Sequence, residues 1–207
     1  MEPGRCSGRW LSVSDRIVHA SGLGVLVGGE RWLFHDLDLD LHRGQCLALT
    51  GENGSGKSTL LRCLYGLQEP TEGKVLVSGQ KPDERDADFR ALVSVLLDDS
   101  ALFEEYTPAQ HFDLLGVAAP EHDLPQVPAR QLSAGQRRRL LLLGAVARPH
   151  RLLLLDEPER AVDAAGRAWL ARLVSGAKAN GSAVVIASHF PPLVTAVADL
   201  VLDLDDE

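Results

Sequence analysis

The sequence has little that could enter a membrane. Its longest apolar run, residues 140–147, is far shorter than the roughly 20 residues of a membrane-spanning helix. The opening residues, MEPGRCSGRW, contain no apolar core of the kind found in a secretory signal. We therefore expect a protein that stays in the cytoplasm, with residues 1–14 as a loose terminal segment and any membrane role supplied by a partner.

Cysteine and positive charge are also scarce. The cysteines Cys6, Cys46 and Cys63 are odd in number and lack the spacing of metal ligands, which predicts reduced thiols. A formal net charge of −8 argues against a nucleic-acid partner, since nucleic-acid-binding faces are usually basic. No internal repeat or low-complexity tract interrupts the 207 residues, 45% of which are hydrophobic, so we expect one globular unit with a substantial core.

The sequence does contain a complete phosphate-loop motif. Residues 51–59 read GENGSGKST and match the pattern G-x-x-x-x-G-K-[ST]. The motif requires a strand before it and a helix after it, and an apolar stretch at residues 45–50 and a run of helix formers at residues 58–65, ending at Gly66, supply both. This agreement disfavours the alternative, a glycine-rich turn with a chance lysine.

Each residue type in the motif suits the binding of a nucleotide. The three glycines allow positive φ angles and a close approach of the backbone to an anion, and the helix N-terminus adds positive partial charge. Lys57 is predicted to contact the β- and γ-phosphates, and the Ser58 hydroxyl to bind Mg²⁺. The predicted nucleotide-binding residues are Gly51, Glu52, Asn53, Gly54, Ser55, Gly56, Lys57, Ser58 and Thr59.

A second motif, RLLLLDEP, occupies residues 151–158. A continuous leucine run is typical of a central parallel strand that is buried on both faces. Such a strand would deliver Asp156 and Glu157 beyond its carboxyl end, where ligands bind in these sheets. Asp156 is predicted to bind Mg²⁺, and Glu157 to orient and polarise the attacking water. An exposed Asp-Glu turn is the alternative, which the phosphate loop in the same chain disfavours.

The other strands are predicted from their apolar patterns. Alternation of apolar and acidic residues at 33–41 predicts a half-exposed strand in an antiparallel sheet, beside a strand at residues 17–27. Residues 74–78 are expected to join the same sheet. Two further strands are predicted at residues 91–97 and 183–187. Residues 199–207 are expected to contain one last strand and an acidic tail.

Helices are predicted mainly in the second half of the chain. Thr107, with Pro108 and Gln110 after it, forms a capping box for a helix that ends near Gly116. Three prolines then break regular structure, so residues 99–132 are expected to form a compact insertion with one good helix. Two more helices are predicted, one from Ser133 to about Arg148 and one at residues 169–179. Arg137, Arg138 and Arg139 lie in the first turns of the helix that begins at Ser133, where cations are slightly disfavoured. A solvated basic helix face is one interpretation, but it leaves the preceding LSAGQ unexplained.

Taken together, the motifs resemble those of the nucleotide-binding subunits of ABC transporters, from about residue 17 to residue 205. LSAGQ is similar to the family signature, Asp163 matches the D-loop aspartate, and His189, directly after a strand, matches the switch histidine. The resemblance implies a P-loop NTPase core with a parallel sheet, an N-terminal antiparallel β subdomain and a short helical insertion. Its signature residues here are Leu132, Ser133, Ala134, Gly135 and Gln136.

The resemblance also implies an ATPase that works in pairs. A homodimer or pseudo-dimer would clamp two ATP molecules with Mg²⁺, and Ser133 and Gly135 would contact the γ-phosphate bound by the partner copy. Lys57, Glu157 and His189 would be the catalytic residues. The pair would drive a separately encoded integral membrane permease from the cytoplasmic face of the membrane. The short insertion and the missing regulatory tail favour export over import.

Three positions depart from the family pattern. Ala134 replaces the first glycine of the signature. Val27 stands where the family usually has an aromatic residue that stacks on adenine, and Trp32, the nearest aromatic residue, is several positions out of register. Asp98 stands where the Q-loop glutamine is expected. As an anion it would attract Mg²⁺ more strongly than glutamine does, or it could point to solvent and simply end its strand.

Two other functions stay open. A soluble ABC-type ATPase acting on nucleic acid or ribosomes usually carries tandem cores or long coiled-coil insertions, which do not fit in 207 residues. A nucleotide-binding regulator with low turnover is the other possibility, and only Val27 and Asp98 favour it.

Overall fold

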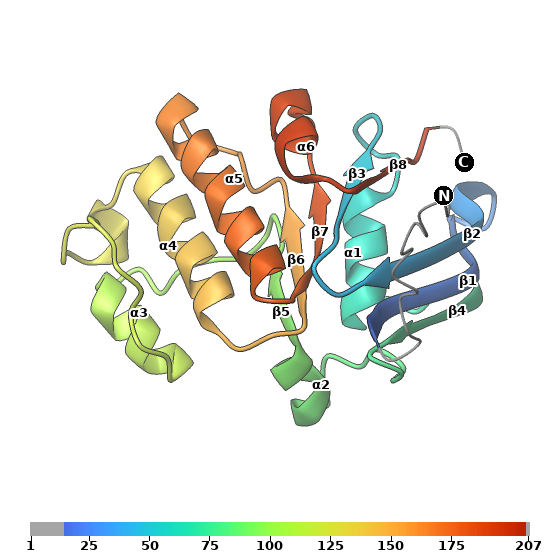
Figure 1. Cartoon of the computed structure of the whole chain (residues 1–207), viewed down its shortest axis with the longest axis horizontal. Helices are drawn as coiled ribbons and strands as arrows, with labels where there is room; N and C mark the ends of the chain where they lie inside the picture. The colour runs from blue at the N-terminus through green and yellow to red at the C-terminus, as the bar shows by residue number, and fades with distance from the viewer. Residues whose placement is uncertain (1–14, 206–207) are drawn as a thin grey trace, which may run out of the picture.

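A five-stranded parallel sheet lies at the centre of the structure, with a three-stranded antiparallel sheet beside it (Figure 1). The computed structural model describes residues 15–205, so the expected loose segment at residues 1–14, which includes Cys6, lies outside the described residues. The parallel sheet contains, in spatial order, β5 (Val93–Leu96), β6 (Leu152–Asp156), β7 (Ala183–Ala187), β3 (Cys46–Thr50) and β8 (Leu200–Asp203). The antiparallel sheet contains, in spatial order, β2 (Arg31–His42), β1 (Arg16–Val27) and β4 (Glu72–Val77). This arrangement confirms the predicted parallel core and the antiparallel subdomain.

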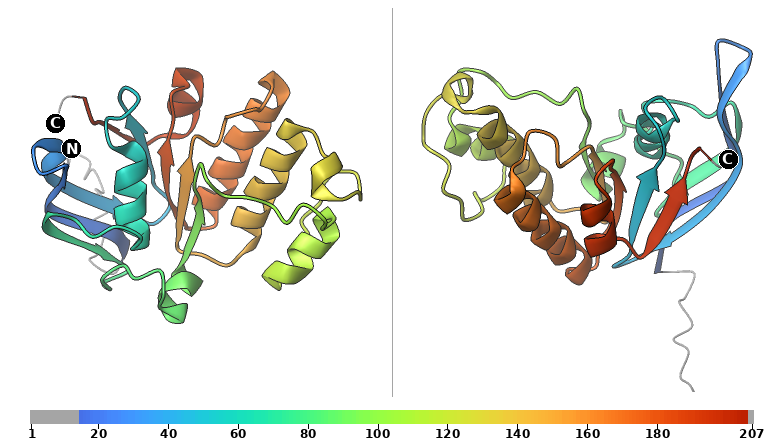
Figure 2. Two further views of the ribbon diagram at one scale, coloured as in Figure 1. Left: turned by 180° about the vertical axis from the view of Figure 1, so that it is seen from behind. Right: turned by 90° about the horizontal axis from the view of Figure 1, so that it is seen from above.

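Helices cover both faces of the parallel sheet. On one face, α1 (Lys57–Tyr65) packs between the parallel and the antiparallel sheets. On the other face lie α4 (Ala134–Ala147), α5 (Ala164–Ala179) and α6 (Pro191–Val197). The view from above in Figure 2 shows these two layers on opposite sides of the sheet.

Strand β6 lies inside the sheet, between β5 and β7. All five of its residues are buried, because β5 and β7 flank it and helices cover both of its faces. Leu152 and Leu154 face the core around α1, and Leu153 and Leu155 face the core around α4 and α5. Burying one leucine side chain stabilises the fold by roughly 1.5–3 kcal/mol. The four leucines therefore anchor the strand that ends at Asp156, as the sequence predicts.

The insertion between β5 and α4 forms a small core of its own. It contains α3 (Pro108–Leu115) and a 3-10 turn, η2 (Ala129–Gln131). Thr107 caps α3 in a capping box with Gln110, and Gly116 ends the helix with a φ of 66°, which confirms the predicted start and end. The core residues of this region are Phe112, Leu124, Ala129, Leu132, Leu140 and Leu143. Since the last two belong to α4, the insertion and α4 pack as one body.

The structure corrects three predicted elements. The strand expected at residues 91–97 is shorter, because Asp86 caps a helix, α2 (Ala87–Leu92), that takes up its first two residues. The helix expected at residues 169–179 begins earlier, at Ala164, because the Asp163 side chain caps it by accepting from the Gly166 N–H at 2.7 Å. Helix α6 was not predicted, since its seven residues are too few for a clear helical period.

The structure also bears on membrane-spanning helices and on the cysteines. Within residues 15–205, no helix combines the length and the apolar character that crossing a bilayer requires. Cys46 and Cys63 are buried free thiols, and burial raises the pKa of each to about 12. At neutral pH both therefore stay protonated and unreactive.

Candidate functional site

The phosphate loop joins β3 to α1 at the carboxyl edge of the parallel sheet (Figure 1). Gly51, Gly54 and Gly56 have φ angles of 126°, 89° and 108°, as predicted for a loop that turns its N–H groups inward. A Cβ added at Gly56 would lie 3.1 Å from atoms of Leu33 and Phe34, so β2 presses against this side of the loop. A Cβ added at Gly54 would meet nothing within 4 Å, so the opposite side is open. The loop thus offers a cradle that only glycines can form.

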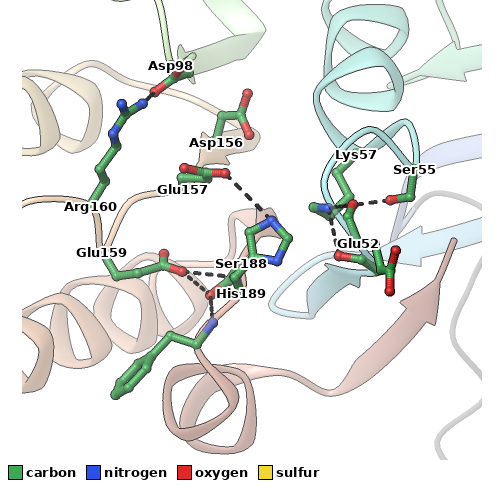
Figure 3. A network of polar contacts seen from close by, with 12 residues as sticks. Glu52, Ser55, Lys57, Asp98, Asp156, Glu157, Glu159, Arg160, Ser188 and His189 are labelled. Carbon is green, nitrogen blue, oxygen red and sulfur yellow. Dashed lines mark hydrogen bonds and ion pairs between the residues drawn. The ribbon is translucent and has the colours of Figure 1, made fainter. Parts of the chain in front are cut away.

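Lys57 lies at the centre of this loop (Figure 3). Its ammonium group donates hydrogen bonds to the carbonyl oxygens of Gly51 and Glu52, at 2.8 and 2.7 Å. The side chain is buried, and burial lowers the pKa of Lys57, while Asp205 and Glu157 act in the opposite direction. A cation with acidic neighbours is therefore held where phosphate groups would enter.

Asp156 and Ser58 come together beside the loop. Asp156 is only 2% exposed, and burial raises the pKa of its carboxyl group, while a hydrogen bond with the Ser58 side chain acts to lower it. A carboxylate next to a hydroxyl fits Mg²⁺, which usually takes one or two protein ligands together with phosphate oxygens. In the part of the chain that the structure describes, no cluster of three or more His, Cys, Asp or Glu side chains could hold a metal.

Glu157 and His189 face each other across the end of the sheet (Figure 3). The Glu157 Oε1 atom lies 3.7 Å from His189 Nε2, which is longer than a direct hydrogen bond. Glu159 fixes the loop that carries His189, because its carboxylate accepts from the Ser188 hydroxyl at 2.5 Å and from the His189 N–H at 3.1 Å. The carboxylate and the imidazole thus reach the same space from two neighbouring strands.

The predicted signature forms the N-terminus of α4. Ser133 caps the helix in a capping box with Gln136, and Leu132 is buried beneath it. A Cβ added at Gly135 would lie 3.0 Å from the carbonyl oxygen of Ala161, so the signature packs against the loop that follows β6. In Figure 1 this end of α4 and the phosphate loop stand at the same edge of the sheet, with β6 and β7 between them.

Asp98 has a partner that was not anticipated. Its carboxylate forms an ion pair with the guanidinium group of Arg160, just beyond Glu157 (Figure 3). The pair raises the pKa of Arg160, and the charge of Asp98 also acts to raise the pKa of Asp156. Asp98 is thus within electrostatic reach of the predicted metal site, but its charge is balanced by Arg160. In this state Asp98 is exposed after the end of β5 and pairs with Arg160 at the surface.

Comparison with known proteins decides what this arrangement is. Residues 34–160 match the family model described as ABC transporter. The chain belongs to this family. It is 38% identical to the cytochrome c biogenesis ATP-binding export protein CcmA of Rhodopseudomonas palustris (strain HaA2), over 84% of this chain and 94% of that protein. It is 36% identical to the cobalt import ATP-binding protein CbiO of Rhodobacter capsulatus, over 84% of this chain and 70% of that protein.

Solved structures agree on the fold. The ATP-binding subunit of an ABC transporter superposes with a TM-score of 0.77 at 21% identity, covering 90% of this chain and 85% of that one. A second structure, cbiO1 from Clostridium perfringens, superposes with a TM-score of 0.76 at 23% identity, covering 91% of this chain and 84% of that one. The protein is an ATP-binding subunit of an ABC transporter and an ATPase.

In this ABC ATPase, Arg138 is a site residue that the sequence did not reveal. A solvated basic face, one interpretation of residues 137–139, does not hold for Arg138, which is only 8% exposed. Its Nη2 atom donates to the carbonyl oxygens of Asp156 and Glu157, at 2.6 and 2.7 Å. Helical spacing is the sequence pattern that could have indicated the burial of Arg138. Leu142 and Ala145, four and seven positions later, are buried on the same face of α4.

The region where the family resemblance places the nucleotide base lacks an aromatic residue at Val27. Val27 is 49% exposed, and Trp32 is engaged elsewhere, since its ring contacts His35 with centroids 4.6 Å apart. A Cβ added at Gly24 would lie 2.9 Å from the Trp32 ring, so this ring covers β1. Arg31 instead extends toward the loop, with its Nη2 atom 3.5 Å from the Gly54 carbonyl oxygen. Aromatic stacking by Trp32 is therefore not supported.

Proposed function

We propose that two copies of this ATPase close around two ATP molecules and drive a separate membrane permease. The observation that carries the dimer is the position of the signature. Ser133 and Ala134 are exposed at the N-terminus of α4, and β6 and β7 lie between this end of α4 and the phosphate loop of the same copy. A helix N-terminus attracts phosphate, so a second copy turned head to tail would present its signature to this loop.

In the proposed site, each residue has one task. Lys57 and the loop N–H groups bind the phosphates, and Ser58 and Asp156 hold Mg²⁺. When bound, the metal would neutralise negative charge on the phosphate oxygens. Glu157 polarises the attacking water, and His189 faces the same space from β7 and contacts the γ-phosphate. The D-loop aspartate, Asp163, caps α5 beside the signature.

We propose that Asp98 takes part in the metal site after it separates from Arg160. Nucleotide binding should then depend on Mg²⁺ more steeply than in a variant with glutamine at this position. We expect Asp98→Gln and Asp98→Ala to need several-fold more Mg²⁺ for half-maximal ATP binding, because a carboxylate attracts the cation more strongly than an amide does. Arg160→Ala should need less Mg²⁺ for half-maximal ATP binding, because the substitution frees Asp98 from its ion pair.

The measurement is ATP affinity and turnover across a Mg²⁺ titration for the parent and the three variants. Asp88→Ala, a substitution at an exposed carboxylate in α2, is the matched control. Superimposable curves for all variants would show that Asp98 has no part in the metal site.

An apolar hollow on the insertion is the proposed docking place for the permease. It has a volume of about 230 Å³ and lies between α3, α4 and β5. Phe103 and Leu114 line it and are 58% and 56% exposed, which is high for large apolar side chains. Ser100, two residues after Asp98, also lines the hollow. A permease seated here would touch the segment that leads to the nucleotide site, and it would hold the ATPase at the cytoplasmic face of the membrane.

Export is the proposed direction of transport. The support is the similarity to CcmA proteins, whose names describe an export protein, together with the short insertion. Import is the second candidate, because the cobalt import protein CbiO is almost as similar.

We expect the parent to co-purify from detergent-solubilised membranes with a protein of several membrane spans that stimulates its ATPase activity. Leu114→Asp should abolish this association and keep basal ATP binding, since a charge in an apolar contact is costly to bury. Leu67→Asp is the matched control, because Leu67 is 49% exposed and lies outside the hollow. Equal recovery of the permease with both variants would contradict docking at the hollow.

A further inference from the structure

The helix that carries the signature also grips the loop that carries Glu157. Arg138 lies on α4, five positions after Ser133, and its side chain runs inward to the end of β6. A single nitrogen, Nη2, donates to two consecutive carbonyl oxygens, those of Asp156 at 2.6 Å and Glu157 at 2.7 Å. These contacts are to the backbone, so they fix where the chain turns after the strand.

Burying the charged guanidinium group of Arg138 costs free energy. Desolvation lowers the pKa of its guanidinium group, against the attraction of Asp98, Asp156 and Glu159. Its Nε atom is also buried without a hydrogen-bond partner among the described residues. A buried charge of this kind is tolerated only when the groups around it compensate for the lost hydration. The guanidinium group is therefore not explained by the packing of α4 alone.

The backbone that Arg138 holds is in a rare conformation. Glu157 has a φ of 43°, in the left-handed region that residues other than glycine seldom adopt. Its N–H donates to the carbonyl oxygen of Ala187 on β7 at 2.9 Å, and Arg138 binds the carbonyl oxygens on the other side. Surrounding contacts must hold such a conformation in place, because it is strained. Here it turns the Glu157 carboxylate toward His189.

A second contact joins the same two segments. Gly135, in the signature, approaches the carbonyl oxygen of Ala161 so closely that an added Cβ would lie 3.0 Å from it. Ala161 also has a positive φ, of 60°. The first two turns of α4 thus contact the loop after β6 at both of its strained residues.

We propose that Arg138 is a positioning residue for ATP hydrolysis, which couples the signature helix to Glu157 of the same subunit. When the signature binds the nucleotide held by the partner copy, any shift of α4 is transmitted through Arg138 to the carboxylate of its own subunit. This rests on the proposed role of Glu157 in polarising water, and it adds a connection between the two nucleotide sites of the dimer.

The test uses Arg138→Met and Arg138→Lys. Methionine fills the buried space but donates no hydrogen bond, and lysine can reach one carbonyl oxygen but not both in the same geometry. We expect Arg138→Met to lower kcat at least about tenfold, with the Kd for ATP changed less than about twofold, as for a group that acts in the transition state only. Arg138→Lys should recover part of kcat. Arg137→Met is the matched control, because Arg137 pairs with Glu104 of the insertion and should leave kcat unchanged.

A double variant separates this proposal from the role of Glu157. If Arg138 acts through Glu157, Arg138→Met should add no further loss of turnover to Glu157→Gln. A further tenfold loss of turnover when Arg138→Met is added to Glu157→Gln would overturn the proposal. A kcat equal to that of the parent in the single variant Arg138→Met would also overturn it. If Glu157→Gln itself kept the parent kcat, the assigned role of Glu157 would fail first. Thermal unfolding shows whether each variant folds. If Arg138→Met does not fold, the kcat of Arg138→Lys is the deciding measurement. A kcat equal to that of the parent would then overturn the proposal.

Discussion

Replacing Glu157 with Gln is expected to lower ATP turnover about 10²-fold or more while ATP binding persists, so that the ATP-bound dimer accumulates. The amide keeps the size of the side chain but cannot accept a proton from water. The Glu157 side chain is 34% exposed and faces His189, so the change should leave the fold intact. Turnover measured by phosphate release, and molar mass measured by light scattering with Mg²⁺ and ATP, would test both parts.

A second substitution shows whether that dimer uses the signature. Ser133→Asp keeps a good N-cap for α4 and adds a negative charge where the partner's γ-phosphate would lie. Combined with Glu157→Gln, it should return the protein to a monomer in ATP. Glu69→Gln, at an exposed ion pair with Lys81, is the surface control and should behave as the parent. Light scattering that finds only monomer for Glu157→Gln with ATP would contradict the shared nucleotide site in the isolated subunit.

Lys57→Ala is expected to weaken ATP binding about 10- to 100-fold, because a hydrogen bond to a charged group contributes about 1.5–3 kcal/mol. The lysine already lies within the loop, bonded to two of its carbonyl oxygens, so its ammonium group needs little movement to meet a phosphate. His189→Ala should behave differently, with turnover lowered at least about tenfold and affinity nearly unchanged. The measurement is nucleotide affinity by titration calorimetry beside steady-state turnover.

The control for this pair is Lys74→Ala, an exposed lysine on β4. A parent rate of hydrolysis in His189→Ala would remove His189 from the mechanism. Parent affinity in Lys57→Ala would show that the loop N–H groups bind the phosphates without help from the lysine.

Local sequence patterns were sufficient for several elements of the fold. The capping box at Thr107 involves residues three positions apart and forms as predicted, and Ser133 begins α4 as its N-cap. The positive φ angles of the loop glycines depend only on the missing Cβ. The leucine run of β6 predicted a strand buried on both faces, because burial of that pattern is favourable in few other ways.

Boundaries set by competition between neighbouring elements were harder to predict. The apolar run at residues 91–97 fits a strand as well as the end of a helix. Asp86 decides between them, because its side chain accepts from the Asp88 N–H at 2.9 Å and begins α2 just before the run. A short apolar run does not contain that information by itself.

The sequence by itself determined the family motifs, the strands that carry them and the type of residue at each position of the nucleotide site. Only the tertiary structure decided which charges meet. Asp98 and Arg160 are 62 positions apart, and Arg138 reaches backbone atoms 18 and 19 positions away. A side chain's local pattern fixes its helical or strand face, but its electrostatic partner depends on which distant segment the sheet and the helices bring beside it. For that reason the sequence alone did not show that Arg138 is buried and contacts the backbone of Asp156 and Glu157.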